Sequence, residues 1–240
     1  MDYIIFVYIL IAACFILGIY AQIKVQSSFS SFSSIEPENP STTELATQKL
    51  LSQAGLTNIE IKQIKGNLTD NYNPKNKTIS LSDSTRADYS VSGIGVIAHE
   101  IGHAVQDKVG YLPFKIRQMI VPFVNIGTFA FYPVFIIGLL VLALSPITSI
   151  GRILIIISCA LYFLSTLFYL VTWPVERDAS NRALALLLES QVLNEDEALM
   201  AKKVLRAAEL TYIATLLTSF AYFLRFFLYV LPIISGGKRK

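Results

Sequence analysis

The chain has two histidines, and they lie four residues apart with a glutamate directly after the first. They stand in the stretch AHEIGH, residues 98–103. On an α-helix, residues i and i+4 share one face, so His99 and His103 can bind a single metal ion while Glu100 stands beside it. In zinc hydrolases with this H-E-x-x-H pattern, the glutamate removes a proton from the metal-activated water. The pattern therefore predicts one zinc ion on His99 and His103, with Glu100 as the catalytic base.

The residues around the motif favour a metal site over a chance match. Both histidines stand in a largely apolar helix, where unpaired polar groups would be costly to bury, and binding a metal removes that cost. The alternative is a pair of buried histidines that are satisfied by ordinary hydrogen bonds.

A catalytic zinc needs a third protein ligand and leaves its fourth position to water. The chain has no further histidine, and its two cysteines, Cys14 and Cys159, fall inside apolar runs where zinc ligation is not expected. The third ligand should therefore be a carboxylate, and Glu176 is the best placed, on a helix expected to begin at Trp173 and Pro174. The alternative is that Glu176 only favours the dipole at the start of that helix.

The composition predicts a membrane protein. Of 240 residues, 53% are hydrophobic, and the mean hydropathy is +0.54, which is too apolar for a soluble enzyme of this size. Four runs are about the ~20 residues long that a spanning helix needs: residues 3–23, 119–144, 153–172 and 212–234. The middle two form a hairpin, which returns the chain to the side it left and brings Glu176 to the compartment of the histidines.

We therefore expect a mainly α-helical multi-pass membrane protein with about four transmembrane helices and a small α+β zincin-like metal-binding domain. The expected parts are an N-terminal anchor (1–23), the zincin-like domain (24–118), a transmembrane hairpin (119–172), a helical segment with the third ligand (173–210) and a C-terminal transmembrane helix with a basic tail (211–240). The residues before Cys14 resemble a lipoprotein processing site, but the apolar run continues past it, which favours an anchor.

The polar region contains the elements that must position the motif. A Ser-rich stretch at 27–34 predicts a linker, and Ser41 to Glu44 predicts a capping box that opens a helix to about residue 54. Strands are expected at 58–62 and 77–82. The second is either an edge strand that could pair with an extended substrate near the metal or a plain hairpin strand. The motif helix should end before Gly110 and lie close to a neighbour at Gly95 and Gly102.

Four stretches together resemble the neutral zinc metallopeptidases of bacterial membranes, the YugP type. They are LTDNYNP (68–74), KTISLS (77–82), AHEIGHAVQ (98–106) and PVERDASNRAL (174–184). The resemblance implies a multi-pass metallopeptidase of the bacterial inner membrane. The chain is more distantly similar to membrane gluzincins of the heat-shock and prenyl-protein protease type, in which Glu176 matches the ligand glutamate. Ser180 stands where that family has an aspartate, so Asp178 is our candidate for orienting a ligand imidazole.

The expected activity is hydrolysis of peptide bonds in a peptide or membrane-protein substrate. Tyr72, Tyr111, Arg177 and Arg182 are all open candidates for stabilising the oxyanion. Two alternatives remain: a membrane scaffold whose zinc has four protein ligands and no catalytic role, and a zinc hydrolase of a non-peptide substrate. The net charge of +3 is small and scattered, so no nucleic-acid partner is expected.

Basic residues also predict the orientation in the bilayer. More of them stand on the side of the motif than on the opposite side, and such an excess favours a site that faces the cytoplasm. On the motif side they are Lys108, Lys115, Arg117, Arg177, Arg182, Lys202, Lys203 and Arg206, against Arg152 and the tail 238–240 on the other.

Overall fold

A computed structural model describes residues 2–39, 43–86 and 89–235. The helices are α1 (Asp2–Phe32), α2 (Thr43–Gln53), α3 (Asp83–Arg86), α4 (Val91–Val109), α5 (Leu112–Leu144), α6 (Thr148–Glu189) and α7 (Glu195–Ile234), and the strands are β1 (Glu60–Ile64), β2 (Asn71–Asn73) and β3 (Thr78–Ser82). The first residues of the predicted capping box and the basic tail at 238–240 lie outside the described residues.

The predicted fold class is confirmed. Within the described residues, four helices are long and apolar enough to cross a membrane: Ile4–Phe32, Leu112–Leu144, Thr148–Glu189 and Glu195–Ile234. The 42 residues of α6 correspond to about 63 Å of helix, roughly twice the ~30 Å of a hydrocarbon core. The apolar half of α6 is long enough to cross a bilayer by itself. The rest of the helix therefore extends beyond the hydrocarbon core.

Two predicted boundaries are wrong. Pro174 does not open a new helix but lies inside α6, and the Ser-rich stretch continues α1 as far as Phe32. A proline removes one backbone hydrogen bond, here to the carbonyl of Leu170, and long helices tolerate this when packing stabilises the turns on either side. Serines within α1 bond back to the helix itself, as the Ser31 hydroxyl does to the carbonyl of Ser27 at 2.7 Å.

Of the two alternatives for residues 77–82, the edge strand is wrong, and the hairpin strand is confirmed by the antiparallel pairing of β2 with β3. The sheet order is β1-β3-β2, with β3 parallel to β1 and antiparallel to β2. Both edges of β3 are thus paired, and its side chains Ile79 and Leu81 are buried. A strand buried in this way needs neighbours on both sides, and the short β2, which was not predicted, supplies the second one.

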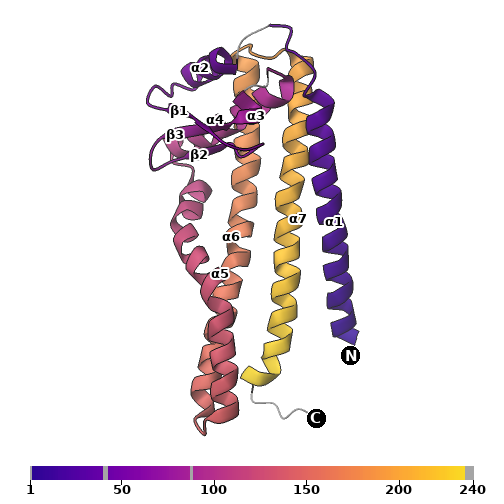
Figure 1. Cartoon of the computed structure of the whole chain (residues 1–240), viewed down its shortest axis with the longest axis vertical. Helices are drawn as coiled ribbons and strands as arrows, with labels where there is room; N and C mark the ends of the chain where they lie inside the picture. The colour runs from indigo at the N-terminus through magenta and orange to yellow at the C-terminus, as the bar shows by residue number, and fades with distance from the viewer. Residues whose placement is uncertain (1, 40–42, 87–88, 236–240) are drawn as a thin grey trace. The chain divides into compact units, whose positions relative to one another are not determined.

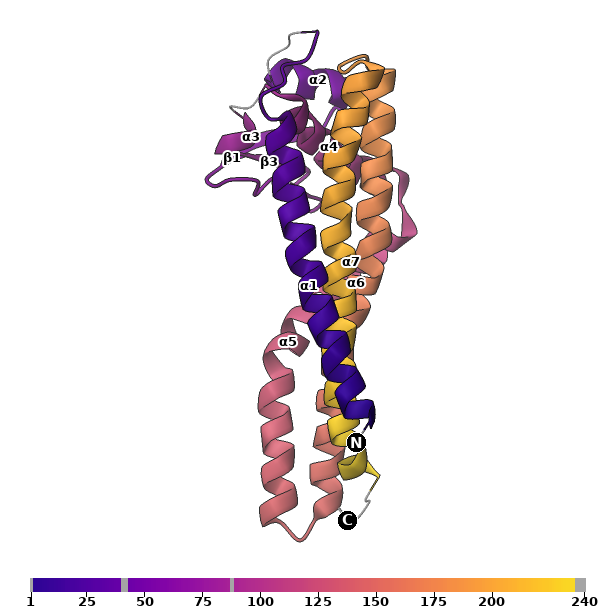
Figure 2. The ribbon, with the colours of Figure 1, turned by 90° about the vertical axis from the view of Figure 1, so that its right-hand side faces the viewer.

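The chain divides into two compact units. One consists of Met1–Ile19, Ile116–Trp173 and Tyr212–Lys240, and the other of Tyr20–Lys115 and Pro174–Thr211. In the second unit the sheet, α2, α3 and α4 gather beside the C-terminal part of α6 and the N-terminal part of α7 (Figures 1 and 2). Its core is formed by apolar side chains of α2, β3, α4, α6 and α7, so α4 is buried among these elements.

Local signals define both ends of α4. Ser90 is the N-cap, and its side chain accepts a hydrogen bond from the N–H of Gly93. Gly110 ends the helix with a φ of 69°, a left-handed conformation that glycine adopts without strain. The helix therefore ends where the sequence predicted.

The first unit contains the predicted hairpin of α5 and α6 (Figure 2). The two helices approach closely at Gly138 and Gly151, where a Cβ added to either glycine would lie 3.1 Å or less from the other's carbonyl oxygen. The Thr166 and Ser219 hydroxyls, 3.0 Å apart, join α6 to α7. Small residues and paired hydroxyls are typical of packing between transmembrane helices.

Candidate metal centre

The second unit brings His99, His103 and Glu176 together. The Oε2 atom of Glu176 lies 3.1 Å from Nε2 of His99 and 3.4 Å from Nε2 of His103. One ligand atom from each residue lies within 4.8 Å of the other two. Both histidines come from one face of α4, and the glutamate comes from α6. Among the described residues, this is the group of three that could hold a metal ion.

The spacing of these atoms fits a zinc ion. Zinc bonds of 2.0–2.2 Å at tetrahedral angles place ligand atoms about 3.4 Å apart, close to the separations from Glu176. The glutamate is 2% exposed and His103 is 7% exposed. Burial alone would raise the pKa of Glu176, but the hydrogen bonds and charges of His103 and His99 outweigh it and hold the pKa well below its usual value. An ionised carboxylate beside two imidazole nitrogens is a donor set that zinc prefers.

Each imidazole is oriented through its other ring nitrogen. The Nδ1 atom of His99 lies 3.2 Å from the hydroxyl of Ser180, and that of His103 lies 3.0 Å from Oε1 of Gln106. When Nδ1 carries the proton and donates it to these oxygens, Nε2 has a free lone pair that faces Glu176. The surroundings of both rings thus favour the tautomer that metal binding requires.

Gln106 contacts one of the candidate ligands, His103, and no role was predicted for it from the sequence. It is fully buried, and its Nε2 donates to the carbonyl of Val175 at 2.7 Å and to Asp178 at 2.8 Å. Asp178 also accepts a bond from Arg182 at 2.6 Å. Asp178, our candidate for orienting an imidazole, therefore lies one contact further out and acts through Gln106. The signal available was the spacing of Gln106, three residues after His103 and so on its face of the helix.

The close approach of α4 and α6 depends on Gly102. A Cβ added at this position would lie 2.4 Å from the carbonyl oxygen of Ala179, far closer than such atoms approach. At Gly95 an added Cβ would lie 3.3 Å from the Cβ of Ala201 on α7. The two glycines that were expected to lie close to one neighbour therefore contact two different helices.

Glu100 is buried beside the three ligand candidates and does not belong to that group. Its carboxylate accepts a hydrogen bond from the backbone N–H of Tyr72 in β2. Burial raises the pKa of Glu100 to about 7, and a cation bound on the neighbouring histidines would lower it again. The residue thus lies at the junction of the motif helix and an edge strand of the sheet.

The open candidates for stabilising an oxyanion have other partners. The Tyr72 hydroxyl donates to Asp107 at 2.7 Å, and Arg177 lies 3.6 Å from Glu209. The guanidinium of Arg182 lies 5.7 Å from the ring centroid of Tyr111 and also bonds Asp178. Of these side chains, Tyr111 has the most freedom to turn towards a substrate, since none of the described residues forms a hydrogen bond with its hydroxyl.

Two comparisons with known proteins match most of the chain. A family model described as "Putative neutral zinc metallopeptidase" matches residues 7–231. The chain is 34% identical over 221 residues to a protein of Bacillus subtilis (strain 168) named "Putative membrane protease YugP", and the match covers 92% of this chain and 94% of that relative. No solved structure matches the chain.

Proposed function

The chain belongs to the neutral zinc metallopeptidase family whose model it matches, and from this premise we propose that it is a membrane-embedded zinc metalloendopeptidase. The observation that carries the proposal is the convergence of His99, His103 and Glu176 within 4.8 Å, with Glu100 buried next to them. The substrate would be a peptide or a membrane protein.

Each residue has a distinct role in the proposed reaction. His99, His103 and Glu176 would hold the zinc ion, which when bound supplies a Lewis acid that polarises a carbonyl and acidifies water from a pKa of about 15.7 to about 7. Glu100 accepts a proton from the attacking water and passes it to the leaving amine. Ser180 and Gln106 keep the two imidazoles in the binding tautomer.

The arrangement supports catalysis more than a structural zinc site. A structural zinc is enclosed by four protein ligands, and the described part of the chain brings three together. Asp178 is the nearby carboxylate that a four-ligand site would use, but it is hydrogen-bonded to Gln106 and Arg182 instead. A non-peptide substrate is the remaining alternative, and a substrate assay decides between the two.

The decisive experiment compares the wild type with Glu100→Gln in purified protein. We expect the variant to keep one zinc ion per chain and to lose at least about 100-fold in kcat on peptide substrates, because an amide cannot accept the proton. Zinc content is measured by elemental analysis and kcat with a fluorogenic peptide library. Glu44→Gln, an exposed change on α2, serves as the control. Full activity of Glu100→Gln would show that another group is the base.

We also propose that the site faces the cytoplasm, in accordance with the excess of basic residues near the motif. Asn67 is exposed in the same unit as the candidate ligands, so Asn67→Cys reports the side on which that unit lies. A membrane-impermeant maleimide should label this variant only after the cells are permeabilised. The two native cysteines are buried and give a low background. Labelling of intact cells would place the site outside.

A further inference from the structure

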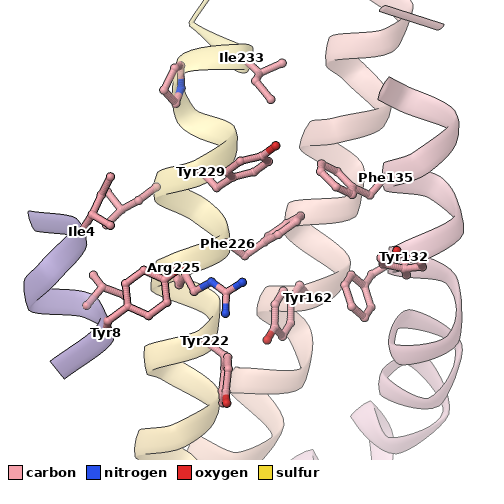
Figure 3. A pocket seen from close by; sticks show the side chains of 14 residues that line it. Ile4, Tyr8, Tyr132, Phe135, Tyr162, Tyr222, Arg225, Phe226, Tyr229 and Ile233 are labelled. Carbon is pink, nitrogen blue, oxygen red and sulfur yellow. The ribbon is translucent and has the colours of Figure 1, made fainter. Parts of the chain in front are cut away.

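A cavity of about 700 Å³ lies within the first unit, between α1, α5, α6 and α7. Most of its lining side chains are aromatic or aliphatic, and one of them, Arg225, is charged. Figure 3 shows Arg225 extending from α7 into the space between Tyr8 and Tyr162. The volume is in the range of small-molecule sites, and the cavity takes no part in the chemistry proposed for the metal centre.

Arg225 has no anionic partner among the described residues. Its guanidinium lies 5.5 Å from the ring centroid of Tyr8, and no described side chain forms a salt bridge or hydrogen bond with it. The segments of this unit contain a single acidic residue, Asp2. A cation within a membrane-spanning helix is costly unless an anion or water compensates it. An anionic ligand in the cavity would therefore compensate the charge of Arg225.

Two hydroxyls near Arg225 are also free to bind a ligand. Tyr162 and Tyr222 line the same cavity, and none of the described residues forms a hydrogen bond with either hydroxyl. A guanidinium has five N–H donors and each phenol has one O–H donor. Such a group of unpaired donors matches the oxygens of a phosphate.

Arg225 lies inside the membrane-spanning part of α7, well away from the end of that helix. It precedes the helix end at Ile234 by nine residues (234 − 225), which is about 14 Å of helix. Tyr8 follows the start of α1 at Asp2 by six residues (8 − 2), or about 9 Å. The wall of the cavity continues from this depth to Ile4 and Ile233, close to those two helix ends, so a lipid can enter the cavity from the headgroup level.

We propose that this cavity binds one anionic phospholipid. Its phosphodiester accepts hydrogen bonds from Arg225 and from the hydroxyls of Tyr162 and Tyr222. The rest of the lipid packs against apolar side chains of the wall such as Phe135 and Ile233. The cation selects for a net negative headgroup, whereas the aromatic wall accepts any acyl chain.

The test uses the full-length protein in nanodiscs with a photoactivatable phosphatidylglycerol, and a phosphatidylcholine with the same photoactivatable chain for comparison. We expect phosphatidylglycerol to label the cavity peptides of α1, α5 and α7 roughly fivefold more than phosphatidylcholine, the preference that one basic residue gives near the headgroups. Arg225→Gln should reduce phosphatidylglycerol labelling to the phosphatidylcholine level, and Arg225→Lys should keep most of it. Arg152→Gln, on α6 and outside the cavity lining, should keep the full preference.

Phosphatidylcholine labelling of the cavity peptides in Arg225→Gln shows whether the cavity is intact, because the apolar wall accepts the acyl chains of either lipid. Equal labelling by the two lipids in the wild type would overturn the proposal. A preference for phosphatidylglycerol that survives Arg225→Gln would also overturn it.

Discussion

At the residue scale, Gln106 connects a ligand imidazole to the helix that carries the third ligand. Its side chain bonds His103, Val175 and Asp178. Gln106→Leu removes all three bonds and should lower zinc affinity about 10- to 100-fold, the usual effect of losing a residue that orients a ligand. Competition with a chromophoric chelator measures the affinity. Gln53→Leu, an exposed change at the end of α2, should leave it unchanged, and an equal loss in both variants would contradict a specific role for Gln106.

The hydroxyl of Tyr72 has two possible roles, which are to stabilise the fold or to donate to the oxyanion. It donates to Asp107, and its pKa is raised by burial and by that carboxylate. Tyr72→Phe should therefore destabilise the fold by about 1–2 kcal/mol through the lost hydrogen bond and should change kcat by less than about tenfold. Losing an oxyanion donor would cost about 100- to 1000-fold in kcat. Thermal unfolding and steady-state kinetics on the same preparation separate the two roles.

At the scale of elements, the site depends on how closely α4 and α6 pack. In an unconstrained helix, Gly→Ala stabilises by about 1 kcal/mol. At Gly102, however, the new Cβ meets the backbone of Ala179, which cannot move without shifting α6 and the glutamate it carries. Gly102→Ala should therefore lose zinc affinity and lower kcat/KM by more than about 100-fold. Gly95→Ala is the matched control, since the Cβ it adds meets a side chain at 3.3 Å. Similar activity in the two variants would show that the spacing of α4 and α6 tolerates the added methyl group.

At the scale of the whole molecule, the metal should link folding to binding. The ligands come from α4 and α6, so zinc bound to them stabilises the folded state by about 2.7 kcal/mol at a free concentration of 100 Kd. A chelator should lower the Tm of the wild type, and zinc should restore it. In Glu176→Ala the Tm should respond much less to either addition. Differential scanning calorimetry in detergent measures these shifts, and an undiminished response of Glu176→Ala would place the metal elsewhere.

The sequence by itself determined the features that depend on local pattern. The spacing of His99, Glu100 and His103 places both imidazoles on one helix face, and this holds wherever the helix packs. The long apolar runs likewise indicated four helices able to span a bilayer. The carboxylate of Glu176 was inferred from the small number of available ligands, and in the structure it lies near both imidazoles.

Only the tertiary structure decided which groups orient the ligands and which strand lies in the centre of the sheet. Ser180 and Gln106 contact the imidazoles because α4 and α6 pack at Gly102, a contact between segments far apart in the chain. β3 has no free edge because β2 pairs with it, and three residues are too few to show a strand pattern. Helix periodicity and hydropathy are local properties, whereas these arrangements arise from long-range packing, which no short stretch of sequence encodes.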